Sequence, residues 1–207
     1  MDRSILSSDS NAEVFFARLP ERDIDGVLFP EERQREILAR NNPVSRRESF
    51  FAWRLLELAV SEIFGLTLEK SGLSKTGGRW SARDFDFSIS HGGDAVVVVI
   101  SRGNVGIDLE PLLRRDDGER IARRFFNDAE FDVYLSSESA MRREAFLRVW
   151  TAKEAIFKSR AESAFAPSDV DSRSQSVHTE ILSIGECDYV LSVATENSVI
   201  IHKEINL

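Results

Sequence analysis

Two carboxylates, Asp108 and Glu110, stand one residue apart in the segment Val105 to Glu110. The segment alternates apolar and non-apolar residues, which predicts a β-strand. Because successive side chains of a strand point to opposite faces, the two acids share one face. Carboxylates this close repel one another unless a cation intervenes, and hard divalent cations such as Mg²⁺ bind to such oxygen pairs. The alternative is an edge strand whose exposed face happens to be acidic.

An acid and a base also interrupt an apolar stripe further along the chain. Residues 140–158 predict a helix, and residues spaced by four lie along one side of it: Phe146, Trp150, Glu154 and Lys158. Lys153 is displaced from Glu154 by roughly 100° around the helix. Charged groups within an apolar stripe need partners, which indicates a site. Two alternatives remain open, a salt bridge between Glu154 and Lys158, or a capping box of Thr151 and Glu154 at a helix start.

A third set of polar residues lies around His91 in the sequence, one of three histidines in the chain. His91 begins a glycine-containing turn, directly after a strand that carries Ser88 and Ser90 on its polar face. Turn glycines and backbone N–H groups suit phosphate oxygens. The alternative is a surface histidine without a role. Arg79 and the pair Arg46-Arg47 are additional basic candidates near this region.

The elements expected around these residues bring them together. Residues 85–90, 95–100 and 105–109 are separated by short turns and predict a three-stranded antiparallel meander. In a meander the first and third strands end at the same edge of the sheet. We therefore expect His91 to lie near Asp108 and Glu110.

The remaining segments predict an α+β protein. Strands are expected over residues 12–19, 179–184, 189–195 and 198–205, helices over 46–64 and before 125, and a loop over 161–176. Local signals mark helix ends: Pro30 and the Asn127/Glu130 pair begin helices, and Gly65 ends one. The order of helix and strands occurs twice, which suggests two similar halves meeting near residue 102.

Composition limits the classes of function. A chain of 207 residues with 42% hydrophobic residues can bury one core or two small ones. Its formal net charge of -8 argues against broad nucleic-acid binding, which depends on many basic residues. We expect a cytoplasmic protein without membrane attachment, because Cys187 is the only cysteine and no apolar run approaches the ~20 residues of a membrane span.

Three motifs together resemble the 4'-phosphopantetheinyl transferase superfamily, in its larger pseudo-dimeric (Sfp-type) class. They are Ser88-Ile89-Ser90-His91, Gly106-Ile107-Asp108-Leu109-Glu110, and the run from Trp150 to Lys158 that contains Lys153-Glu154-Ala155. The resemblance implies an α+β fold of two similar halves, residues 1–101 and 102–207, each with an antiparallel sheet and a packed long helix. The active site would lie at their interface, and the chain would act as a monomer.

The resemblance also implies a reaction and its residues. Mg²⁺ held by Asp108, Glu110 and Glu154 would meet the pyrophosphate of coenzyme A. A serine of an apo acyl or peptidyl carrier protein would attack the phosphorus on the pantetheine side and release 3',5'-ADP. Glu154 or a water on the metal would take the serine proton, with Lys158 and Lys153 offsetting charge.

The phosphates of coenzyme A would contact further residues by the same resemblance. These are His91, Ser90, Arg47 and Arg79, although Gly78-Arg79-Trp80 departs from the usual glycine-lysine-proline. The arginines of residues 114–124 are candidates for docking the acidic carrier. Two other hypotheses stay open: a non-catalytic member that binds coenzyme A or a carrier protein, and a structural α+β domain whose acids are merely solvated.

Overall fold

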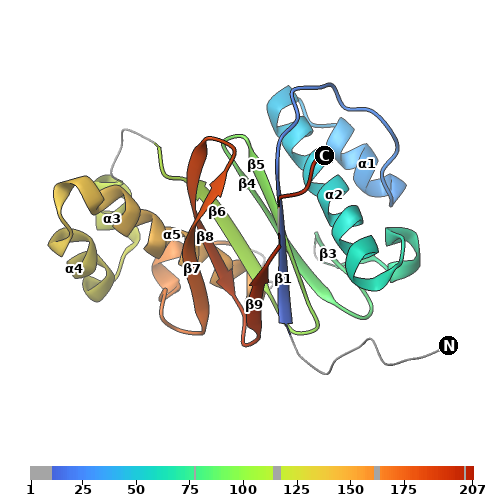
Figure 1. Ribbon diagram of the computed structural model, residues 1–207. Coiled ribbons are helices and arrows are strands. Elements are labelled where there is room, and N and C mark those ends of the chain that lie inside the picture. Colours follow the sequence, from blue (N-terminus) through green and yellow to red (C-terminus); the bar gives the residue numbers. More distant parts are fainter. Residues whose placement is uncertain (1–10, 77, 114–117, 161–163, 203) are drawn as a thin grey trace.

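The chain folds into two main sheets flanked by helices (Figure 1). The structure is a computed structural model of the 207-residue chain and describes residues 11–76, 78–113, 118–160, 164–202 and 204–207. One sheet has the order β4-β5-β1-β9, with β1 at Asn11–Arg18, β4 at Asp86–Gly92, β5 at Ala95–Ser101 and β9 at Ser198–Ile201. The second has the order β6-β8-β7, with β6 at Gly106–Pro111, β7 at Val177–Ile184 and β8 at Cys187–Ala194.

Two long helices and several short elements complete the described chain. The helices are α1 at Glu31–Leu38, α2 at Pro43–Phe64, α3 at Glu119–Phe125, α4 at Asp128–Ser136 and α5 at Arg142–Arg160. A small hairpin pairs β2 at Ser74–Thr76 with β3 at Arg79–Ser81. Single 3₁₀ turns lie at Leu68–Ser71, Ser139–Met141 and Pro167–Asp169. None of the described helices combines the length and the apolar character needed to cross a membrane.

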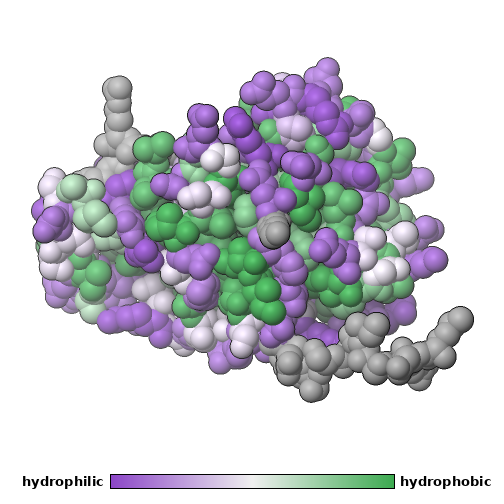
Figure 2. All heavy atoms as spheres, in the orientation of Figure 1, coloured by the Kyte–Doolittle hydropathy of each residue, from purple (hydrophilic) through white to green (hydrophobic). Residues whose placement is uncertain are grey.

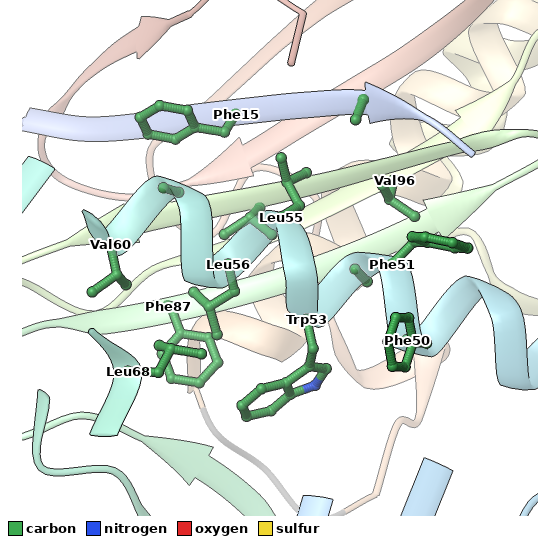
Figure 3. Packing of buried hydrophobic residues seen from close by; sticks show 14 of the residues in the cluster. Phe15, Phe50, Phe51, Trp53, Leu55, Leu56, Val60, Leu68, Phe87 and Val96 are labelled. Atoms are coloured by element: carbon green, nitrogen blue, oxygen red, sulfur yellow. The ribbon is translucent and has the colours of Figure 1, made fainter. Parts of the chain in front are cut away.

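Helix α2 covers one face of the first sheet. Figure 3 shows Trp53, Leu56 and Val60 of this helix packed with Phe15 of β1 and Phe87 of β4. The helix begins after Asn42, whose side chain accepts hydrogen bonds from two backbone N–H groups, and it ends at Gly65 in the left-handed conformation with φ 63°. The apolar spacing and the terminal glycine therefore predicted this helix correctly.

Strand β5 is buried on both faces, which explains its uninterrupted apolar sequence. Val96, Val98 and Ile100 belong to the α2 cluster, and alternate residues such as Val97 and Val99 join a second cluster with β6 and β8. On the face drawn in Figure 2, hydrophobic residues gather over the middle of the molecule, where β7, β8 and β9 lie in Figure 1. Apolar side chains of the two sheets thus pack in one cluster, while the backbone hydrogen bonds of each sheet stay separate.

The predicted meander is wrong in its third strand. β4 and β5 pair antiparallel as expected, but β6 pairs with β8 and leaves the first sheet. β6 nevertheless runs beside β4, because three β4 side chains take the place of a backbone ladder. They accept hydrogen bonds from backbone N–H groups: Asp86 from Val105, Ser88 from Ile107 and Ser90 from Leu109, over 3.1, 3.1 and 3.3 Å. The two strands therefore still end at the same edge.

The three closing strands exist, but the last does not extend their sheet. β9 is shorter than expected and pairs parallel with β1, and the backbone N–H groups of His202 and Ile205 then donate to carbonyls of β1. The chain after residue 102 thus returns to the sheet of the N-terminal segment. The predicted starts at Pro30 and Asn127 are confirmed, and Asn127 with Glu130 forms a complete capping box.

Candidate active site

Gly106 allows α5 to lie directly on β6. A Cβ atom at this position would come within 2.0 Å of the Ala155 carbonyl oxygen and 2.5 Å of the Ser159 nitrogen. Any other residue would therefore push the helix away from the strand. Asp108 follows two residues along β6, and Glu154 and Lys158 stand next to the two contacted helical residues. The contact at Gly106 thus brings the acids of the strand and the charged residues of the helix together.

Lys158 lies at the centre of the resulting cluster. Its Nζ is 2.7 Å from Asp108 Oδ1, 3.3 Å from Ser90 Oγ and 3.8 Å from Glu154 Oε2. Ser90 in turn donates to Asp108 Oδ1 over 2.8 Å. The Asp108 side chain is only 4% exposed, because β6 lies between β4 and β8. Asp108 therefore does not lie on an exposed face, although β6 is the edge strand of its three-stranded sheet.

Glu154 completes an acidic group with Asp108 and Glu110. Burial, and then the like charges of Asp108 and Glu110, raise the pKa of Glu154 to about 7, while Lys158 opposes the rise. The alternative of a capping box is wrong, because Thr151 lies within α5 and donates to the carbonyl of Leu147. The i, i+4 contact with Lys158 exists, but Glu154 also interacts with the acids of β6. Glu154 is therefore part of the acidic cluster as well as of the ion pair with Lys158.

The donor atoms of this cluster suit a hard cation. Asp108 Oδ2 is buried and has no hydrogen-bond partner, so one carboxylate oxygen is left for a ligand. Within the part of the chain that the structure describes, no three His, Cys, Asp or Glu side chains are already arranged as metal ligands. The positive charge between Asp108 and Glu154 is that of the Lys158 ammonium group.

His91 lies at the same edge, as the sequence predicts. Its Nδ1 is 3.5 Å from Glu48 Oε2. Burial lowers the pKa of His91, and the positive charges of Lys158 and Arg40 lower it further. The negative charges of Glu48 and Asp108 oppose this change. The sequence interpretation missed Glu48 and Arg40, whose only local signal is a position before or within the first turns of α2.

Arg47 lines a cavity that none of the residues of the Asp108 cluster borders. With Arg46 it borders a cavity of about 390 Å³ at the start of α2, beside Asp23 and Ile24. The Nε atoms of both arginines are buried without a hydrogen-bond partner. Arg47 is thus placed on the helix that carries Glu48, and its side chain has capacity to bind an acceptor.

Arg79 is engaged by groups of the protein itself. Its Nη2 lies 2.9 Å from both carboxylate oxygens of Asp86, and its Nη1 donates to the carbonyl oxygen of Lys158. Arg79 separates two cavities, one of about 650 Å³ near Asp86 and one of about 320 Å³ that Lys158 also lines.

Lys153 points away from the cluster. Its side chain is 0% exposed, with Nζ 2.8 Å from Glu130 Oε2 and 3.1 Å from the Pro167 carbonyl oxygen, and it also donates to the Val170 carbonyl. The roughly 100° between Lys153 and Glu154 on the helix directs the two residues to different sides. The structure thus brings Asp108, Glu110, Glu154, Lys158, Ser90 and His91 together, and it does not bring Lys153 to them.

Comparisons with known proteins identify the family of this chain. The model of the 4'-phosphopantetheinyl transferase superfamily matches residues 104–183, which include β6 and α5. The chain is 33% identical over 147 residues to the 4'-phosphopantetheinyl transferase AcpT of Salmonella typhimurium, an alignment that covers 69% of this chain and 71% of that protein.

Two further relatives carry the same description. The 4'-phosphopantetheinyl transferase gsp of Aneurinibacillus migulanus is 26% identical over 164 residues, covering 75% of this chain and 68% of gsp. The 4'-phosphopantetheinyl transferase psf-1 of Bacillus pumilus is 30% identical over 119 residues, covering 56% of this chain and 50% of psf-1. The chain belongs to the 4'-phosphopantetheinyl transferase superfamily, as its motifs predicted.

Proposed function

We propose that this chain transfers the 4'-phosphopantetheine group of coenzyme A to a serine hydroxyl of an apo acyl or peptidyl carrier protein. The observation that carries the proposal is the meeting of Asp108, Glu154 and Lys158 from a strand and a helix around one point. In this reaction the serine oxygen bonds to the phosphorus on the pantetheine side. The bond from that phosphorus to the bridging oxygen breaks, and its electron pair leaves with 3',5'-ADP.

Glu154 is the proposed base that receives the serine proton. Its carboxylate lies beside Asp108 and Lys158, where the serine hydroxyl and the pyrophosphate would meet, so one of its oxygens can accept the proton. Lys158 is proposed to offset the negative charge that grows on the leaving oxygens. Its ammonium group lies among the acids that would hold Mg²⁺ beside the phosphates. Ser90 holds Asp108 in place through the hydrogen bond between them.

Mg²⁺ is the proposed cofactor, held by Asp108, Glu110 and Glu154. The fit rests on their carboxylate oxygens and on the unpartnered Oδ2 of Asp108. When bound, the ion supplies positive charge beside the pyrophosphate. This charge would also favour the ionised form of the acids, which repel one another without it.

The two arms of coenzyme A would extend to opposite sides of the pyrophosphate. His91 and Ser90 are proposed to contact its phosphates, with Arg47 on the same side for the 3'-phosphate. The cavity of about 320 Å³ beside Lys158 has aromatic walls that include Trp53 and Phe157, and we assign it to the pantetheine arm. Lys153 is left out of this proposed site because its ammonium group is already surrounded by acceptors.

The two-half organisation is part of the proposal. Residues 1–101 would form the coenzyme A side and residues 102–207 would carry the metal ligands, with the active site between them. Support comes from the way one long helix packs on each sheet, α2 on the first and α5 on the second (Figure 1). β9, however, returns to the first sheet. The carrier is proposed to dock on exposed arginines of α3, Arg120, Arg123 and Arg124; Arg114 and Arg115 lie outside the described residues.

Two measurements test the function. Coenzyme A with Mg²⁺ should raise the thermal midpoint of unfolding, because a ligand of the folded state stabilises it. Incubation with an apo carrier, coenzyme A and Mg²⁺ should increase the carrier mass by one phosphopantetheine group. Asp108→Ala and Glu154→Ala should abolish this increase while remaining folded, and Asp132→Ala, which alters an exposed acid of α4, should not.

The same measurements separate the other hypotheses. Stabilisation by coenzyme A without any mass increase across several carrier types would favour a non-catalytic binder. Retained transfer in purified Asp108→Ala or Glu154→Ala would show that the metal ligands are misassigned.

A further inference from the structure

Arg79 and Asp86 form an ion pair at the start of the strand that leads to His91. The Asp86 carboxylate contacts Arg79 Nη2 through both oxygens at 2.9 Å and accepts a hydrogen bond of 3.1 Å from the Val105 backbone N–H. One carboxylate thus joins β3, β4 and the residue before β6. The Arg79 side chain is 28% exposed, so the pair is only partly screened by water.

The same arginine reaches the end of the catalytic helix. Arg79 Nη1 donates to the carbonyl oxygen of Lys158, which belongs to the last turn of α5. The last four carbonyls of a helix lack partners within the helix, and cationic side chains there also interact favourably with the helix dipole. Arg79 therefore caps α5 at the residue whose side chain reaches Asp108.

These contacts form a closed loop around Lys158. Its backbone is held by Arg79, which is held by Asp86, which contacts Val105; its side chain is held by Asp108, three residues after Val105 on the same segment. A lysine side chain has four flexible bonds, so its ammonium position depends on where the backbone is fixed. An error of about 1 Å in the position of a catalytic group can lower the rate roughly 100-fold.

The charge of Arg79 is already balanced within this loop. Asp86 neutralises it one to one, and both terminal nitrogens have protein acceptors. Such an arginine has less to offer a phosphate than one whose guanidinium group points into a cavity. The direct role in gripping coenzyme A that the motif comparison suggests for Arg79 is therefore not the one its contacts favour.

We infer that Asp86 and Arg79 are positioning residues that fix Lys158 for the transfer step, an inference that rests on the proposed function. Both act through Lys158 and neither touches the reacting atoms. Their loss should lower kcat and leave the binding of coenzyme A largely unchanged, because the groups assigned to its phosphates remain. Arg79 also lines the cavity assigned to the pantetheine arm, but its guanidinium group is engaged by Asp86 and the Lys158 carbonyl.

The test compares Arg79→Ala, Asp86→Asn and the double variant with wild type. Each single variant should lower kcat about 10- to 100-fold, with the KM and the calorimetric Kd for coenzyme A within about twofold. The double variant should be no slower than the worse single variant, because the two residues act as one unit. Arg83→Ala is the matched control: it removes an exposed arginine from the same 650 Å³ cavity and should retain the wild-type kcat.

Several outcomes would overturn the inference. One is an Arg79→Ala variant whose Kd for coenzyme A rises tenfold with kcat unchanged, since Arg79 would then grip the coenzyme. Others are wild-type kcat in either single variant, or additive losses in the double variant. If Asp86→Asn does not fold, Arg79→Ala decides alone, because Arg79 lies on the small β2-β3 hairpin outside both main sheets. A wild-type protein that transfers nothing would instead refute the proposed function.

Discussion

Replacing Gly106 by alanine tests the contact on which the proposed site depends. The added Cβ would lie 2.0 Å from the Ala155 carbonyl oxygen, whereas Cβ contacts below 3.0 Å essentially never occur. Strand and helix must therefore separate by about 1 Å or distort. A separation of that size would stretch the 2.7 Å contact between Lys158 Nζ and Asp108 Oδ1 beyond the ~3.2 Å limit of a good hydrogen bond.

Both stability and rate should respond. Inserting a methyl group into a closed contact costs about 1–3 kcal/mol of unfolding free energy, or roughly 2–12 °C in thermal midpoint for a chain of this size. The loss of alignment should lower kcat about 100-fold. Thermal unfolding and the mass of an apo carrier after timed incubation measure the two effects.

Gly103→Ala is the control for this substitution. Its added Cβ would meet only Asn197 Nδ2 at 3.5 Å, an ordinary contact, so stability and rate should stay near wild type. Our reasoning would be refuted by a Gly106→Ala variant with wild-type stability. A destabilised variant that still transfers at the wild-type rate would refute the link between this contact and the site.

Three further predictions concern charged residues. Because the folded state raises the pKa of Glu154 from 4.5 to about 7, its stabilising proton is fully bound below pH 4.5 and is lost as the pH rises through 7. At pH 8 without Mg²⁺, the free energy of unfolding of Glu154→Gln should therefore exceed that of wild type by about 1–3 kcal/mol, and this difference should disappear near pH 4.5. Parallel profiles of unfolding free energy against pH for the two proteins would contradict the shift in pKa. Lys153→Met should destabilise the fold by about 3–5 kcal/mol in denaturant unfolding, because Glu130 stays buried without its cation, and a raised Kd for coenzyme A in a folded sample would argue for a ligand role instead. Reversing Arg120 and Arg124 to glutamate should lower kcat/KM for an acidic carrier about tenfold at low salt, with the Kd for coenzyme A unchanged; a salt-independent loss would speak against electrostatic docking.

Local sequence determined most individual elements. The cap at Asn127, the left-handed glycine at position 65 and the apolar period of α2 depend on contacts within a few residues, so each could be recognised without the fold. The same holds for the face shared by Asp108 and Glu110, since alternation along a strand follows from backbone geometry alone. The motifs then indicated the superfamily.

Only the tertiary structure decided how these elements combine. β6 pairs with β8, and it lies beside β4 without a backbone ladder because serine and aspartate side chains of β4 accept hydrogen bonds from its backbone N–H groups. These contacts join residues that are 19 positions apart in the chain. The helical period separates Lys153 from Lys158, but only the fold shows that Lys153 pairs with Glu130 and Lys158 with Asp108, 50 residues away. Burial and the charges of distant partners set the direction of a side chain and the pKa of Glu154, and both depend on the packed protein rather than on neighbours along the chain.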